Sequence, residues 1–210
     1  MRRAFAQHGV TLIEVSILML VTLSIVGALA PTLSSIVRHA ETVAATTAMS
    51  NIDTVINTVL GDMNYQYLTS TGVKNDAANR TNLLVGDGDI PPAVSGTGSA
   101  TWQGAVQGTT IDFLERYLVT NNPGGSGANA YPVPATENGA GWRGAYLDNP
   151  LDPDPWGNRY MVNVEYLGAS NNDVVVYSAG PDEEIDSLYT ALNFNTLTVD
   201  DDLFIIQEAN

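Results

Sequence analysis

The longest hydrophobic stretch of the chain lies close to its N-terminus. Residues 10–37 form a run of 28 positions in which Glu14 is the single charged residue. As an α-helix this run would be about 42 Å long, which exceeds the roughly 30 Å thickness of a bilayer's hydrocarbon core. The apolar part of a secretory signal peptide has only about 7 to 15 residues, so cleavage after the run is not expected. The pattern therefore predicts a helix that spans a membrane.

Basic residues flank this run on both sides. Arg2 and Arg3 precede it, and Arg38 follows it. Because positive charge is enriched on the cytoplasmic side of membrane helices, the two leading arginines favour a cytoplasmic N-terminus, although Arg38 weakens the asymmetry. We therefore expect the chain beyond about residue 40 to lie outside the cytoplasmic membrane.

Helical periodicity continues past the hydrophobic run. Apolar side chains recur three or four positions apart at Met49, Ile52, Val55, Ile56, Val59 and Leu60. Residues 40–60 contain no glycine or proline, so we expect one helix from Val10 to about Leu60 whose outer half packs its apolar face on a sheet. Pro31 removes one helical N–H, and Gly27 lies four residues before it, which predicts a kink or local unwinding there.

The remainder of the chain has the composition of a single turn-rich head, since glycine and proline are concentrated after residue 85. Residues 160–167 and 174–178 are predicted to form two β-strands joined by a turn. Residues 111–118 predict a short helix, whereas most of residues 65–134 is polar and weakly patterned. The expected fold class is α+β, with the long N-terminal helix packed on a small antiparallel sheet.

The segment Gly9-Val10-Thr11-Leu12-Ile13-Glu14 resembles the class III leader motif of type IV pilins and type II secretion pseudopilins. The resemblance implies that a prepilin peptidase cuts after Gly9 and that Val10, where phenylalanine is more usual, becomes the N-methylated first residue. Pro31 falls where many members of these families carry a proline. The resemblance thus divides the chain into a cleaved leader, a transmembrane and filament-core helix, and a globular head that includes the outer half of the helix, at residues 1–9, 10–37 and 38–210.

The single charge of the hydrophobic run has two interpretations. In a bundle of such helices, Glu14 would pair with the free α-amino group of a neighbouring subunit's Val10, since a buried charge is tolerated chiefly when it is paired. The alternative is a plain signal-anchor helix in which the Glu14 carboxylate reaches the membrane interface. That alternative leaves the spacing between Gly9 and Glu14 unexplained.

Three segments of the C-terminal part resemble landmarks of the major pseudopilin of type II secretion systems, at residues 142–147, 154–160 and 177–182. The second of them contains Asp154-Pro155-Trp156-Gly157-Asn158, which is typical of a turn. Proline fixes φ at its position, and Gly157 and Asn158 tolerate positive φ.

The same resemblance implies a calcium site in the loop that follows the last predicted strand. The matching positions are the side chains of Asp182, Asp201 and Asp202, together with the backbone carbonyl of Ala179. Carboxylate and carbonyl oxygens are the ligands that Ca²⁺ prefers, usually six to eight of them. Glu183 stands where the family usually has glycine. The alternative is a solvated acidic loop that binds no ion.

Composition excludes several classes of function. The formal net charge is −15, which makes nucleic acid a poor partner and favours cations, although an acidic surface is also typical of solvated faces and of adaptation to salt. The chain has no cysteine and two histidines that flank the hydrophobic run, and its serines lack the context of a nucleophile. We therefore expect no enzyme, and a membrane-tethered glycosidase or metal hydrolase is the disfavoured enzymatic alternative.

The resemblance implies a structural subunit of a type II secretion pseudopilus. Such a subunit is held in the bacterial inner membrane with its head in the periplasm, and assembles with copies of itself into a helical filament that assists protein export across the outer membrane. Its implied partners are the prepilin peptidase, the inner-membrane assembly platform and the minor pseudopilins. The alternatives are a type IV pilus subunit for adhesion or motility, and a membrane-anchored calcium-dependent binding module.

Overall fold

The computed structural model describes residues 11–92, 111–147, 151–165, 167, 174–187 and 201–207. The chain divides into two compact units, Met1–Glu41 and Thr42–Asn210. The first unit contains the beginning of helix α1 (Leu12–Met63), and the second contains its remainder and the β-sheet. The residues expected to be processed, Gly9 and Val10, lie outside the described part.

The part of α1 in the first unit exposes apolar side chains on all sides. Every large hydrophobic residue from Leu12 to Val37 is exposed, and a window of 18 residues reaches a mean hydropathy of 2.4. The hydroxyl groups of Ser16, Thr22 and Ser24 each donate to the carbonyl four residues earlier, at 2.7 to 2.9 Å. Because these hydroxyl groups are satisfied within the helix and the surface is apolar, this segment fits a single-pass membrane anchor.

Helix α1 runs through Pro31 without a break, so of the two expected effects, a kink or a local unwinding, the unwinding does not occur. A proline removes a single N–H from the ladder, which need not interrupt a long helix. Beside it, the hydroxyl of Thr32 donates to the carbonyl of Leu29 at 2.7 Å. The helix ends three residues beyond the expected Leu60.

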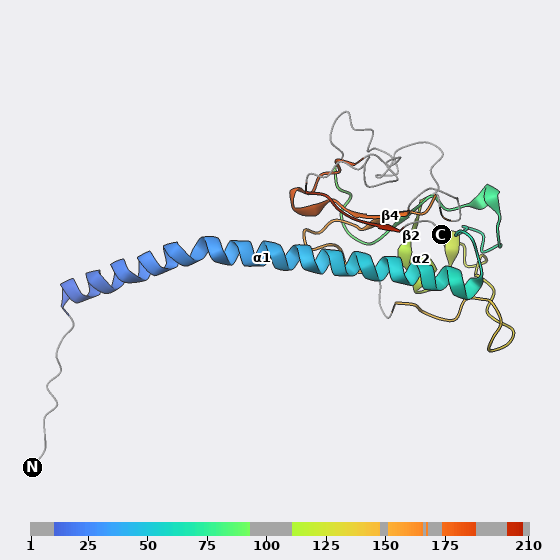
Figure 1. Cartoon of the computed structure of the whole chain (residues 1–210), viewed down its shortest axis with the longest axis horizontal. Coiled ribbons are helices and arrows are strands. Elements are labelled where there is room, and N and C mark those ends of the chain that lie inside the picture. The colour runs from blue at the N-terminus through green and yellow to red at the C-terminus, as the bar shows by residue number, and fades with distance from the viewer. Residues whose placement is uncertain are drawn as a thin grey trace, which may run out of the picture. The chain divides into compact units, whose positions relative to one another are not determined.

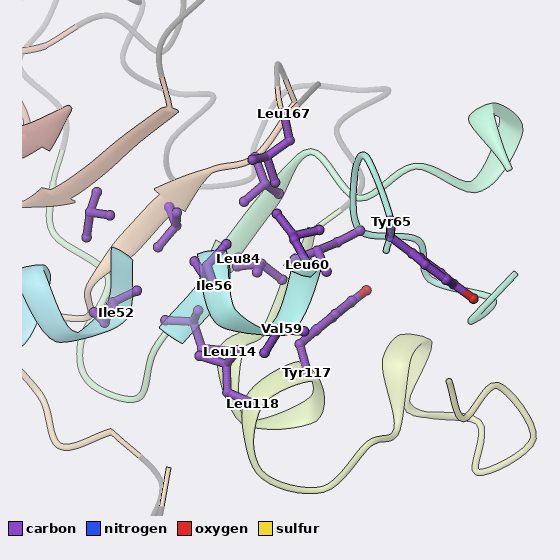
Figure 2. Close-up of a cluster of buried hydrophobic side chains, with 14 of the residues drawn as sticks. Ile52, Ile56, Val59, Leu60, Tyr65, Leu84, Leu114, Tyr117, Leu118 and Leu167 are labelled. Carbon is purple, nitrogen blue, oxygen red and sulfur yellow. The ribbon is translucent and has the colours of Figure 1, made fainter. Parts of the chain in front are cut away.

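In the second unit, α1 buries one face, as the periodicity predicts. The buried residues are Ala45, Met49, Ile52, Ile56, Val59, Leu60 and Met63. Figure 2 shows Ile56 and Leu60 beside Leu84 of the sheet, and Val59 beside Leu114. Val55 is partly buried at the border of the same cluster. The packing of this helix on the sheet is therefore confirmed.

The sheet has five strands in the order β2-β1-β3-β4-β5. The strands are β1 (Leu83–Val85), β2 (Ile111–Phe113), β3 (Met161–Asn163), β4 (Val174–Ser178) and β5 (Leu203–Gln207). Figure 1 shows β4 and the short helix α2 beside the C-terminal part of α1. The pairs are antiparallel, as expected, except that β1 and β2 pair in parallel.

The two strands predicted in the C-terminal part are confirmed as β3 and β4, with Met161 opposite Tyr177. Strand β3 is shorter than expected. The side chain of Asn163 accepts the N–H of Glu165 at 3.1 Å, and the N–H of Leu167 bonds the carbonyl of Val164 at 3.3 Å. These local bonds compete with the ladder and turn the chain.

The helix predicted for residues 111–118 is wrong over its first half. Residues Ile111–Phe113 form β2, and only Leu114–Leu118 form α2. The reason lies at Asp112, which is 2% exposed. Its Oδ2 accepts the N–H of Gly124 at 2.6 Å, and strand pairing with β1 holds the backbone extended.

The sheet is covered on both sides. Alternate residues of its strands face α1 and the opposite side, because side chains of a strand alternate between faces. The side opposite α1 carries a second apolar cluster of Leu83, Val85, Met161, Val175, Tyr177, Ala179 and Ile185. The last two of these residues belong to the loop that follows β4, so this cluster positions the acidic loop.

Candidate functional site

The turn at residues 154–158 anchors the end of β4. Asp154 is 4% exposed, and its Oδ1 accepts the N–H groups of Trp156 and Asn158 at 3.1 and 2.8 Å. Its Oδ2 accepts the hydroxyl of Ser178, the last residue of β4, at 2.7 Å. Gly157 has φ 99°, as expected, whereas Asn158 is not among the residues with positive φ. The turn thus fixes the point where the acidic loop begins.

The loop opens with a single 3₁₀ turn, Gly180–Asp182, which depends on glycine. Gly180 has φ 71°, and a Cβ at this position would lie 2.2 Å from the carbonyl oxygen of Asp201. Only glycine allows both the left-handed backbone and this close approach. Gly180 therefore lets the segment before β5 lie directly against the loop after β4, although the two are far apart in the sequence.

This approach gathers three carboxylates. Asp182, Asp186 and Asp201 each place one carboxylate oxygen within 4.8 Å of the others. Asp182 is exposed, and the other two are half-buried. Clustered oxygen donors on loops held close by their backbone suit a hard cation such as Ca²⁺. The structure therefore brings together two of the expected residues, Asp182 and Asp201, with Asp186 as the third in place of Asp202.

Asp202, which the sequence also suggested as a ligand, does not belong to this group of three carboxylates. It is 4% exposed, and its Oδ2 accepts the N–H of Asp186 at 3.2 Å and the hydroxyl of Ser187 at 3.3 Å. Burial raises the pKa of Asp202 to about 7, and the nearby charge of Asp186 adds to this. The structure thus places Asp202 behind the three-carboxylate group, where it holds the segment that carries Asp186. Ala179 is buried in the second apolar cluster.

Sequence reasoning missed Asp186 because it fell in the spacer between two motifs. The signal that could have found it was the position after Asp182, where the family usually has glycine and a turn is therefore expected. Asp182 is followed by a left-handed residue, Glu183 with φ 64°, which turns the chain so that Asp186 returns toward Asp182. Glycine, the usual residue at this position by the resemblance, adopts such a φ without strain.

At the other end of the chain, Glu14 is engaged within its own helix. Its Oε2 accepts the N–H of Thr11 at 2.8 Å and the hydroxyl of Thr11 at 2.9 Å. The N–H of Glu14 points back to the Thr11 hydroxyl at 3.4 Å. This is a capping box, whose sequence signature Thr-x-x-Glu was present but not used in predicting the role of Glu14.

Comparison with known families finds a match in the C-terminal part of the chain. Residues 120–190 match the family model described as Type II secretion system (T2SS), protein G. No curated protein and no solved structure matches the chain. The matched segment contains the Asp154 turn, β3, β4 and the beginning of the acidic loop. The resemblance to the major pseudopilin of type II secretion, a structural subunit, is thereby confirmed over residues 120–190.

Proposed function

We propose that this chain is a pseudopilin that assembles with copies of itself into a type II secretion pseudopilus and assists protein export across the outer membrane. The observation that supports this most is the joint presence of the protein G match in the head and of an exposed apolar helix at the N-terminus. Such a helix needs an apolar environment, which a bilayer offers before assembly and neighbouring helices offer afterwards.

Processing after Gly9 would release the chain for this assembly. In the proposal, a prepilin peptidase removes residues 1–9 and Val10 becomes the N-methylated first residue. The variant Gly9→Val should accumulate as an uncleaved, membrane-held precursor. Mass spectrometry of the membrane fraction distinguishes the two forms, and a variant that is cleaved like the wild type would contradict the proposal.

Glu14 would set the register between subunits by pairing with the α-amino group of a neighbour's Val10. The capping box offers a sharp test, because glutamine can also occupy the third position of such a box. Glu14→Gln should keep the helix cap and membrane insertion but lose the charge, and with it ordered filaments. Thr11→Val serves as the counterpart, since it removes the hydroxyl of the cap and keeps the charge of Glu14. Normal filaments of Glu14→Gln in electron micrographs would remove the charge from the mechanism.

The three-carboxylate group would bind Ca²⁺ and thereby hold the loop that follows β4 against the segment before β5. Binding only to the folded head would stabilise it by RT ln(1 + [L]/Kd), about 2.7 kcal/mol at a hundredfold excess over Kd. We expect calcium to raise the melting temperature of the full chain in detergent micelles relative to chelator. Asp186→Asn and Asp201→Asn should abolish the difference, and Asp152→Asn, an exposed carboxylate elsewhere, should not.

The remaining partners follow from the same proposal. The subunit would be held in the inner membrane with its head in the periplasm, and would meet the assembly platform in the membrane and minor pseudopilins in the fibre. Cross-linking at exposed α1 positions such as Leu23 should yield ladders of the chain with itself. A chain that stays monomeric in its native host would instead favour a membrane-anchored binding module.

A further inference from the structure

A cavity of about 350 Å³ lies at the end of β1, beside the first turn of α2. Part of its lining is buried and apolar and comes from Val85 and Leu114. The ring of Phe113, which is 46% exposed, also lines it. Two exposed acidic residues, Asp87 and Glu115, complete this part of the wall. The cavity therefore combines an apolar floor, an aromatic ring and two negative charges.

The arginine that lines the same cavity does not neutralise those charges. Nη1 of Arg116 lies 2.5 Å from Oδ1 of Asp112, which is 2% exposed. The guanidinium carbon of Arg116 lies 5.0 Å from the centre of the Phe113 ring. Because Arg116 is paired with Asp112, the carboxylates of Asp87 and Glu115 give the lining a net negative charge.

Arg116 is the one basic residue of the head that lines the cavity, and Arg159 lies close by at Gly88, next to Asp87. Residues 42–210 carry 21 acidic and five basic side chains, all five in the described part. Three more arginines donate to backbone carbonyls of their own chain, namely Arg80 to Leu167, Arg143 to Glu137 and Gly139, and Arg159 to Gly88. Lys74 lies over the Tyr65 ring at 5.8 Å. The cavity lining thus carries the carboxylates of Asp87 and Glu115 and one cation, Arg116, which is paired with Asp112.

We propose that the cavity receives an arginine or lysine side chain of a partner protein. The stem of such a side chain packs on Val85 and Leu114, and the cationic head meets the Phe113 ring and the carboxylates of Asp87 and Glu115. The apolar floor, the aromatic ring and the negative charge of the cavity all favour a long side chain with a cationic end. The site is separate from the acidic loop and independent of the pseudopilin proposal.

The test uses the full chain in non-ionic detergent micelles, labelled with 4-fluorophenylalanine. The ¹⁹F resonance of Phe113 is assigned by its loss in Phe113→Leu. The probes are acetyl-arginine-N-methylamide and its neutral analogue acetyl-citrulline-N-methylamide, compared at equal ionic strength. The proposal predicts a saturable shift of the Phe113 resonance with the arginine probe and a much smaller one with the citrulline probe.

Charge at the cavity is tested with matched double variants. Asp87→Asn/Glu115→Gln should weaken binding of the arginine probe about fivefold, as expected for the loss of two exposed ion pairs. Glu137→Gln/Glu184→Gln removes two exposed carboxylates from other loops and should leave binding unchanged. Equal responses to the two probes, no response at Phe113, or equal losses in the two double variants would overturn the proposal.

Discussion

The two sides of the sheet are built on different principles. Toward α1, the contacts are apolar and come from residues at helical spacing, so burial of hydrocarbon supplies the stability. On the opposite side, the acidic loop is held by the close approach at Gly180 and by the buried carboxylate of Asp202. Buried carboxylates cost free energy unless their partners are in place. We therefore expect the α1 side to set overall stability and the loop side to respond to cations and pH.

The largest effect is expected on the α1 side. Ile56→Ala should lower the free energy of unfolding by about 2 to 5 kcal/mol, because Ile56 is 1% exposed and truncation leaves a cavity. Val43→Ala, at a position of the same helix that is 50% exposed, should change it by less than about 0.5 kcal/mol. Urea unfolding of the full chain in micelles measures both. Similar values for the two variants would remove the contrast between the buried and exposed faces.

The effect of close approach at Gly180 can be separated from that of backbone strain, because Gly127, in another loop, has nearly the same φ. Gly180 and Gly127 have φ of 71° and 69°, but a Cβ at Gly127 would meet nothing within 4 Å. Gly127→Ala should cost about 1 to 2 kcal/mol through the left-handed backbone alone. Gly180→Ala should cost clearly more and also abolish the calcium-dependent rise in melting temperature. Equal losses would mean that the loop and the segment before β5 do not need to touch.

The pH dependence of the loop side follows from Asp202. Its pKa is about 7 in the folded chain and about 3.9 in an unfolded one, so between these values the folded state binds more protons. This group therefore makes stability fall as pH rises from about 4 to 7. In the presence of chelator, lowering the pH from 7.5 to 5.5 should raise the melting temperature of the wild type relative to that of Asp202→Asn. A constant difference over that range would show that Asp202 keeps an ordinary pKa.

The smallest effect is expected at Glu183, whose φ of 64° is left-handed. Glu183→Gly should relieve strain of about 1 kcal/mol, which is partly offset by the greater freedom of glycine in the unfolded chain. The net change in the free energy of unfolding should be within about 0.5 kcal/mol and stabilising. Glu184→Gly is the control, since its φ is not positive, and should destabilise. A destabilised Glu183→Gly would contradict the strain attributed to this position.

This contrast also explains what could be predicted from the sequence. Periodicity predicted the buried face of α1 because apolar residues three or four positions apart, such as Ile52, Ile56 and Val59, lie on the same face of a helix. The strands β3 and β4 were predicted for the same reason, although the local bond at Asn163 shortened the first of them. Apolar patterns of this kind can be recognised within a single segment of the sequence.

The parts that were missed depend on partners far away in the sequence. The strand at Ile111–Phe113 forms because β1 pairs with it and because Asp112 binds Gly124, neither of which its own residues reveal. Asp201 meets Asp182 and Asp186 only because Gly180 lets the segment before β5 lie against the loop after β4. Periodicity carries no information on such contacts. The cap at Thr11 and Glu14 is a different case, because its Thr-x-x-Glu signature is visible in the sequence. The role of Glu14 was nevertheless attributed to assembly alone.

The mass of the mature N-terminal peptide, isolated from the native host, tests the pseudopilin account most directly. The account predicts a chain that begins at N-methylated Val10 and lacks residues 1–9. A chain that retains Met1 to Gly9, or that begins beyond the apolar part of α1, would contradict it.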